Sequence, residues 1–195
     1  MHYVPALRVA LELYHMPTRV RILRSRSLPD GIDVLLRIVG GDHAAAAEAA
    51  ELTDRSADVM QNAAAFFIEQ ILFYPEADSY RVLGASRDAK ASELRHNMAL
   101  LLAWLHPDID RGGDRSIYAA RVTKAWEDLK TPERRTAYDK ARHARKKTHR
   151  SRMKAAGPLT APIKRRQSRL GHVIALPRKE PARLLQRLLS VLLGR

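Results

Sequence analysis

The sequence predicts an all-α protein, and three observations support this class. Apolar residues recur every three or four positions on both sides of residues 106–114, which indicates one-sided helices. Proline, glycine and N-cap residues stand where these stripes begin or end. The connection between the two longest stripes is short and polar, so their helices should be antiparallel neighbours.

The central pair of helices is predicted over residues 93–105 and about 115–130. Their facing stripes are Leu94, Met98, Leu101 and Leu105 in the first and Tyr118, Val122, Ala125 and Leu129 in the second. His106, Pro107 and Asp108 form the tip, because the Pro107 ring disfavours helical backbone in the residue before it. Taken alone this tripeptide predicts only a helix stop, since a histidine suits the negative C-terminal end of a helix.

Shorter helical segments flank this hairpin. Residues 79–84 are too few for a stable isolated helix and end in Gly84, which predicts a glycine cap. Downstream, Thr131 is the expected N-cap of a further helix, with Pro132 at its first position and Glu133 in its first turn. The predicted order is therefore short helix, long helix, tip, long helix, short helix.

Residues 78–141 resemble a J domain, the module of DnaJ-type co-chaperones. The resemblance rests on an ordered set of motifs that are weak singly and specific together. They are Tyr80-Arg81-Val82-Leu83-Gly84, Ala89, Glu93-Leu94, His106-Pro107-Asp108, Gly112-Gly113-Asp114, Ala125-Trp126 with Leu129, Thr131-Pro132-Glu133-Arg134-Arg135, and Ala137-Tyr138-Asp139. The resemblance covers about a third of the chain. It indicates a minimal bacterial J protein without glycine/phenylalanine-rich or zinc-binding regions.

This resemblance implies a co-chaperone and not an enzyme. J domains bind the ATP state of a DnaK-type chaperone and accelerate its ATP hydrolysis, which traps a client polypeptide. Matched by position, the trigger would be His106, Pro107 and Asp108. Further chaperone contacts would come from Arg95, His96, Arg134 and Arg135. No cofactor and no metal ion is expected.

The helix before the tip departs from the J-domain pattern. Most of the family has a basic outer face there, which meets an acidic surface of the chaperone, whereas here only Arg95 and, when protonated, His96 are basic. Leu100, Leu102 and Trp104 lie outside the inward stripe, and a helix that is apolar on most sides is usually buried. We therefore expect the preceding N-terminal helices to cover it. Weaker electrostatic steering toward a chaperone should follow.

The formal net charge of +14 is unevenly distributed. Residues 1–139 carry 18 Lys and Arg against 20 Asp and Glu, whereas residues 140–195 carry 17 against Glu180 alone. The basic character therefore belongs to the C-terminal part. The chain has no cysteine, which excludes disulfides, thiolate metal sites and a cysteine nucleophile. No signal peptide or membrane span is predicted, so we expect a cytoplasmic protein.

The N-terminal part is expected to comprise an arm, residues 1–27, and a helical segment, residues 28–77, that packs on the J domain. Within the arm, residues 18–26 fit an extended arm or a solvated loop, and the loop is preferred. Three helices are predicted after it. The first starts at Pro29-Asp30 and ends at Gly40-Gly41, the second covers residues 44–52, and the third covers about 55–74. The last two have a helix-turn-helix spacing, but the third helix offers Asp58, Gln61, Asn62 and Glu69 where DNA binding needs basic residues. A packed bundle is therefore the favoured interpretation.

The J domain is expected over residues 78–144, followed by a basic flexible linker, residues 145–180, and an amphipathic helix, residues 181–195. The start of the basic run after Arg142 is also open to a second interpretation, as a continuation of the last J-domain helix. Candidate contacts to nucleic acid or anionic lipid are Arg145, Lys146, Lys147, Arg150, Lys164, Arg165 and Arg166. Such contacts act mainly by counterion release and carry no sequence selectivity. For the amphipathic helix, docking on the chain's own core, membrane-surface binding and self-association stay open.

Three functional hypotheses follow. The leading one is a J-domain co-chaperone that stimulates the ATPase of a DnaK-type chaperone. The runner-up is a protein that binds nucleic acid or a membrane surface through residues 142–195 and uses the J fold as a scaffold, with the inner face of the cytoplasmic membrane as a second location. The third is a J-like module that binds the chaperone without activating it.

Overall fold

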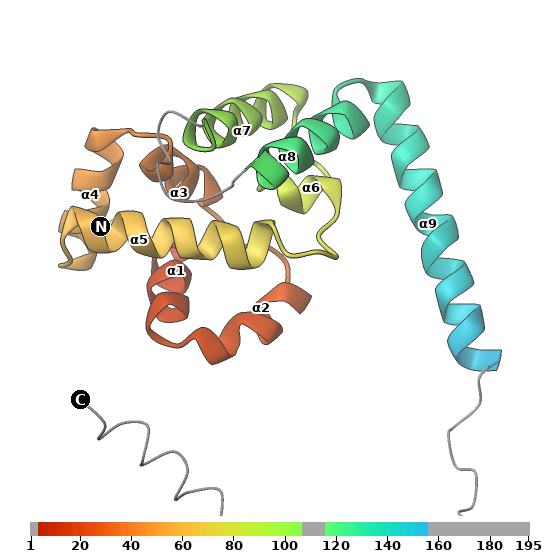
Figure 1. Cartoon of the computed structure of the whole chain (residues 1–195), viewed down its shortest axis with the longest axis horizontal. Coiled ribbons are helices and arrows are strands. Elements are labelled where there is room, and N and C mark those ends of the chain that lie inside the picture. Colours follow the sequence, from red (N-terminus) through yellow and green to blue (C-terminus); the bar gives the residue numbers. More distant parts are fainter. Residues whose placement is uncertain (1–3, 107–115, 156–195) are drawn as a thin grey trace, which may run out of the picture. The chain divides into compact units, whose positions relative to one another are not determined.

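The computed structural model describes residues 4–106 and 116–155 (Figure 1). Every regular element within these residues is helical, in agreement with the predicted all-α class. The chain divides into one unit of residues 1–155 and a second of residues 156–195, and all described residues belong to the first. The finer domain boundaries given above stay predictions.

Three short elements begin the described chain: α1 (Pro5–His15), the 3-10 turn η1 (Pro17–Arg19) and α2 (Val20–Ser25). The prediction of a loop over residues 18–26 is therefore wrong. Arg24 Nε donates to the carbonyl oxygen of Gln70 at 2.8 Å, and the Arg24 guanidinium lies over the Tyr74 ring. A helix as short as α2 is not stable alone. It is held by this contact with a distant segment, which the local sequence does not reveal.

Helix α1 belongs to the hydrophobic core. Leu7, Ala10 and Leu13 are buried, and α1 packs against α5 (Ala57–Phe67). The spacing of three between these residues gives α1 one apolar side. Residues 1–27, which we expected to form an arm, thus contribute a helix to the bundle.

The three helices predicted between residues 28 and 77 are confirmed. They are α3 (Ile32–Val39), α4 (His43–Thr53) and α5, which continues into the π-helical turn η2 (Ile68–Leu72). Asp42 caps α4 by accepting a hydrogen bond from the Ala45 amide at 3.0 Å. That bond, followed by the Arg37 guanidinium, holds the pKa of Asp42 below its usual range.

The predicted hairpin is confirmed as well. Helix α6 (Ser79–Val82) precedes α7 (Ala91–Trp104), which packs against α8 (Ser116–Leu129). All the predicted stripe residues are buried except Met98 and Tyr118, which are half-buried. Gly84, the predicted cap of α6, has a φ of +64°, a left-handed conformation that glycine adopts without strain.

Helix α9 (Pro132–Ala155) is longer than expected. Thr131 Oγ1 accepts from the Arg134 amide at 3.3 Å, which confirms the predicted N-cap. The prediction of a short last helix is wrong, and residues 145–155 of the expected flexible linker are helical. The reason is that Ala, Arg and Lys favour helix and no proline or glycine interrupts the chain before Gly157.

The N-terminal helices cover the apolar side of α7. Helix α3 lies beside α7 (Figure 1) and packs against it. At this contact Leu100 meets Gly40, where an added Cβ atom would lie 3.2 Å from a Leu100 methyl carbon. Trp104 is only 6% exposed and stacks on Phe73, the residue after η2. The leucine and tryptophan outside the inward stripe thus contact the chain's own N-terminal segment.

Tyr80 ties α6 to α9. Its hydroxyl donates to Asp139 Oδ2 at 3.1 Å, and its ring lies edge-on to the Tyr138 ring. Burial, followed by the hydrogen bond to Asp139, raises the pKa of Tyr80 to about 12. The neutral phenol is therefore the form that the folded protein favours.

Tyr80→Phe should make the protein less sensitive to alkali. The ordinary pKa of Tyr80 is 10 and the folded value is higher, so the neutral phenol stabilises the fold below pH 10, and this stabilisation is lost as the pH rises toward 12. Between neutral pH and about pH 12, the wild type should lose roughly 2 kcal/mol more of its free energy of unfolding than the variant. Urea unfolding across this range measures the difference, and equal losses would contradict the prediction.

Candidate functional site

His106 is exposed directly after the buried end of α7. The two residues before it, Trp104 and Leu105, are 6% and 4% exposed and anchor this end in the core. The His106 amide donates to the Ala103 carbonyl oxygen at 3.3 Å, which continues the helical hydrogen-bonding pattern one step past the helix. The backbone that presents the imidazole is thereby fixed. The other two residues of the predicted tip, Pro107 and Asp108, lie outside the described residues.

One exposed stripe runs along α7 toward His106. We call it the outer stripe; it consists of Ser92, Arg95, His96, Ala99 and Ala103, all exposed and spaced by three or four residues. Arg95 and His96, predicted as chaperone contacts, both lie on it. The two alanines leave the last two turns before His106 free of bulky side chains. A partner surface can therefore approach this part of the helix closely.

A shallow hollow of about 520 Å³ lies between the outer stripe and α8. Its opposite wall is Trp126 on α8 and Lys130 directly after α8, and the Arg95 guanidinium carbon lies 5.9 Å from the centroid of the Trp126 ring. Lys130 also donates to Glu127 at 2.8 Å, and this hydrogen bond, with the charge of Arg134, holds the pKa of Glu127 below its usual range. Lys130 was not among the predicted site residues. The signal for it was its position four residues after Trp126.

The other two predicted chaperone contacts are engaged within the chain. Arg134 Nη1 donates to the carbonyl oxygen of Glu127 at 2.9 Å and to its carboxylate at 2.8 Å. Arg135 Nη2 donates to the Ala89 carbonyl oxygen at 2.9 Å, and its guanidinium lies over the Tyr80 ring. Arg134 therefore joins α9 to α8, and Arg135 joins α9 to α6 and to the segment between α6 and α7. Their role in chaperone contact stays a prediction.

The predicted basic contacts fall only partly within the described chain. Arg145 and Lys147 are exposed on α9. Lys146 and Arg150 belong to the same helix, but their side chains are outside the description. Lys164, Arg165, Arg166 and the amphipathic segment 181–195 lie outside the described residues altogether.

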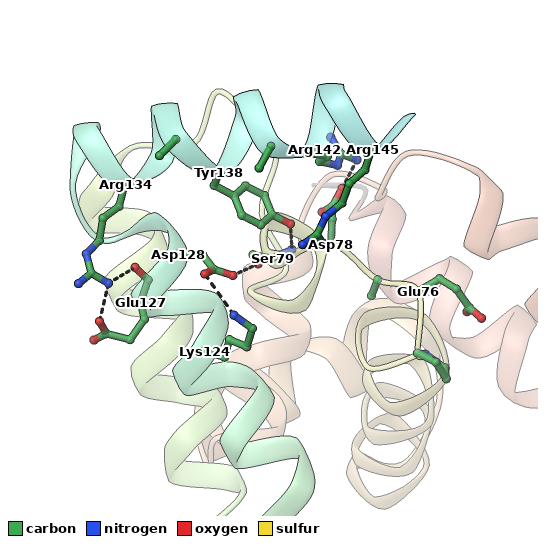
Figure 2. Close-up of a pocket in the computed structure, with 14 residues that line it drawn as sticks. Glu76, Asp78, Ser79, Lys124, Glu127, Asp128, Arg134, Tyr138, Arg142 and Arg145 are labelled. Carbon is green, nitrogen blue, oxygen red and sulfur yellow. Dashed lines mark hydrogen bonds and ion pairs between the residues drawn. The ribbon is translucent and has the colours of Figure 1, made fainter. Parts of the chain in front are cut away.

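Figure 2 shows a polar hollow of about 710 Å³ where α8 and α9 meet the start of α6. Its side chains are largely paired with one another. Arg142 forms an ion pair with Asp78, the Ser79 amide donates to the Tyr138 hydroxyl at 2.8 Å, and Ser79 Oγ donates to Asp128 at 2.8 Å. We interpret this hollow as a joint that fixes α9 and not as a ligand site.

The described residues contain no other obvious chemical centre. Within residues 4–106 and 116–155, no group of three His, Asp or Glu side chains could hold a metal ion. In the same residues, no helix is both long enough and apolar enough to cross a bilayer.

Four features of the segment from α6 to α9 agree with the J-type hairpin predicted from the sequence. They are a short α6, a packed pair α7 and α8, an exposed histidine after α7, and an α9 joined back to α6. Residues 78–139, which include α6, α7, α8 and the start of α9, match the family model of the DnaJ domain. This match agrees with the resemblance drawn from the sequence motifs.

Several curated proteins are similar to this segment. The chaperone protein DnaJ of Latilactobacillus sakei is 40% identical over 67 residues, which are 34% of this chain and 18% of that protein. DnaJ of Roseiflexus castenholzii is 34% identical over 67 residues, with the same two shares. A curved DNA-binding protein of Coxiella burnetii is 39% identical over 62 residues, 32% of this chain and 20% of that protein. The chain thus spans about a fifth of the length of these relatives. No solved structure matches it significantly.

Proposed function

We propose that this protein is a J-domain co-chaperone that binds a DnaK-type chaperone and stimulates its ATP hydrolysis. The observation that carries the proposal is the exposed His106, held by the buried pair Trp104 and Leu105 within a segment that matches the DnaJ domain. In this proposal His106, Pro107 and Asp108 act on the chaperone, and the chain itself performs no chemistry. The cytoplasm is the proposed place of action.

The physical basis is a preorganised contact. A histidine on a fixed backbone can hydrogen-bond to a partner with little loss of conformational entropy. Binding changes the partner's state only if the affinity for this surface differs between the partner's two states. The tip would therefore have to fit the hydrolysis-competent state of the chaperone better than its other state.

The outer stripe is the proposed docking face. Ala99 and Ala103 permit close approach, while Arg95, with Lys130 across the hollow, supplies the positive charge. This is a small charge for attracting an acidic surface. We therefore expect slower association with the chaperone, and a weaker dependence on salt, than a fully basic helix would give.

Ala99→Glu should weaken the stimulation of the chaperone. The substitution places a carboxylate on the docking face one turn from Arg95, where it opposes an acidic partner and neutralises the arginine. Glutamate is a good helix former, so α7 should persist. The chain concentration that gives half-maximal stimulation in single-turnover ATP hydrolysis should rise about tenfold, which corresponds to 1.4 kcal/mol.

Ala144→Glu is the matched control for this experiment, because Ala144 is also an exposed helical alanine but lies on α9. It should leave half-maximal stimulation unchanged. Equal behaviour of the two variants would exclude the outer stripe as the docking face. No stimulation by the wild type would overturn the co-chaperone proposal. Binding without stimulation would favour the J-like module that holds a chaperone without triggering it.

A second function is favoured by the length of α9, which extends to Ala155 and exposes Arg145 and Lys147. We propose that residues 142–195 bind nucleic acid or an anionic membrane surface through their positive charge. Similarity over the DnaJ-like segment does not discriminate between the two functions, since relatives named as a chaperone and as a DNA-binding protein both share it.

Binding through these basic residues should weaken steeply with salt and should survive His106→Gln. For a duplex, the logarithm of the binding constant should fall linearly with the logarithm of the salt concentration. Fluorescence anisotropy with a random-sequence duplex measures this, and co-sedimentation with vesicles containing anionic lipid tests the membrane alternative. Failure to bind either at low salt would rule out this second function.

A further inference from the structure

Phe73 lies between the two helices of the hairpin, although it belongs to the N-terminal segment. Its ring centroid is 4.9 Å from that of Tyr118 on α8 and 6.4 Å from that of Trp104 on α7, and both ring pairs have an interplanar angle of 20°. Phe73 is 2% exposed and Trp104 is 6% exposed. Aromatic pairs in this distance range stabilise a structure by more than their buried area alone would.

The backbone at Phe73 is fixed to the same hairpin. Arg121 on α8 donates from its guanidinium to the carbonyl oxygens of Phe73 and Tyr74, the latter at 2.7 Å. The Phe73 amide donates to the Ile68 carbonyl oxygen at 3.0 Å, which closes the π-helical turn η2. One hydrogen bond thus closes the turn, and the charged Arg121 guanidinium holds the carbonyl groups of Phe73 and Tyr74, the two residues after it. The ring of Phe73 has little freedom to move relative to α8.

The two rings that Phe73 contacts flank the tip along the chain. Trp104 is the last residue of α7, two positions before His106, and Tyr118 lies in the first turn of α8. The same phenylalanine therefore fixes the end of the helix that leads into the tip and the start of the helix that leads out of it. Phe73 thus stacks on one ring from each helix of the hairpin.

We propose that Phe73 is a positioning residue for His106, and that residues 28–77 serve as an internal brace of the end of α7 that presents it. The proposal rests on the proposed function for its activity readout. It assigns residues 28–77 a role in activity besides stability. Phe73 contacts no chaperone in this proposal; it acts by fixing Trp104 and Tyr118, and through them the orientation of His106.

Phe73→Leu in the full chain tests the brace, with Phe67→Leu as the matched control. Both phenylalanines are almost fully buried, Phe67 at 1% and Phe73 at 2%, and the substitution is the same. Both variants should lose similar stability and are compared at a temperature where circular dichroism shows them folded. Phe73→Leu should lower the maximal stimulated rate of a DnaK-type chaperone by about tenfold at an unchanged half-saturating concentration. Phe67→Leu should retain the wild-type maximal rate.

Tyr118 provides the rescue pair. Tyr118→Phe keeps the ring that stacks on Phe73 and should keep the stimulated rate, whereas Tyr118→Leu removes the ring and should behave like Phe73→Leu. Equal losses in the two leucine variants Phe73→Leu and Phe67→Leu would reduce Phe73 to ordinary core packing and overturn the inference. Full activity of Phe73→Leu would do the same.

A second readout separates this inference from the proposed function. The imidazole resonances of His106, assigned by their loss in His106→Gln, should shift or broaden in Phe73→Leu and stay unchanged in Phe67→Leu, and this measurement needs no chaperone. If the wild type does not stimulate the chaperone but the His106 resonances change in Phe73→Leu, the co-chaperone function is excluded and the brace is supported. His106 imidazole resonances that stay unchanged in Phe73→Leu would overturn the brace, whatever the stimulated ATPase rate.

Discussion

His106→Gln should abolish the stimulation of ATP hydrolysis by a DnaK-type chaperone while leaving the protein folded. Glutamine keeps a hydrogen-bonding side chain of similar reach but removes the imidazole ring. His106 is exposed, so the core anchored by Trp104 and Leu105 should be unaffected. The stimulated rate should fall to the basal rate, a loss of about tenfold or more, or at least 1.4 kcal/mol of transition-state stabilisation.

Single-turnover hydrolysis measures this loss, and His143→Gln is the control. His143 is also an exposed histidine, but it lies on α9 away from the outer stripe. The control should stimulate like the wild type. Retained stimulation in His106→Gln would show that the histidine is not the trigger. Loss of stimulation in both variants would show that the loss is not specific to His106.

Phe67→Ala should destabilise the hairpin and the N-terminal bundle together, by about 3–5 kcal/mol. Phe67 is 1% exposed near the end of α5, which packs against α1, α3, α4 and η2. Its removal leaves a cavity beside a helix whose main packing partners belong to the N-terminal bundle. Because residues 1–155 form one compact unit, we expect the loss to be shared by α7 and α8.

Urea unfolding followed by two probes measures this coupling. The only two tryptophans, Trp104 and Trp126, are both in the hairpin, so their fluorescence reports on α7 and α8. Circular dichroism reports on all helices. Coincident shifts of both transitions to lower urea would establish a single cooperative unit. An unshifted fluorescence transition would show that the hairpin folds independently of the N-terminal helices.

The parts of the fold that were predictable are those whose signal is local. Apolar spacing placed α3, α5, α7 and α8, and the cap residues Asp42, Gly84 and Thr131 stand where their chemistry requires them. Helix α2 was missed because its stability comes from the contact between Arg24 and Gln70, which are far apart in the sequence. The full length of α9 was missed because a dense positive charge resembles a disordered linker, although its residues are good helix formers.

The site divides along the same line. His106 and the basic pair Arg95 and His96 were identified from the motif and its preceding helix, and the structure places them on one exposed side of α7. Phe73 and Arg121 were not identified, because their significance lies in contacts with residues more than thirty positions away. A phenylalanine before a proline-containing turn reads as ordinary core in any single sequence. Only the packed structure shows which rings it meets.

The joint between α6 and α9 has a consequence for how the protein is made. Its bonds join Ser79 to Tyr138 and Asp78 to Arg142, so they cannot form until the first half of α9 has left the ribosome. Contacts among α1, α3, α4 and α5 need only the first third of the chain, and N-terminal parts generally fold first during synthesis. The N-terminal helices, which Phe73 follows in the chain, should thus be folded already when the hairpin leaves the ribosome, so that the hairpin can pack against them. During synthesis, the N-terminal helices that brace the end of α7 should therefore fold before the hairpin does.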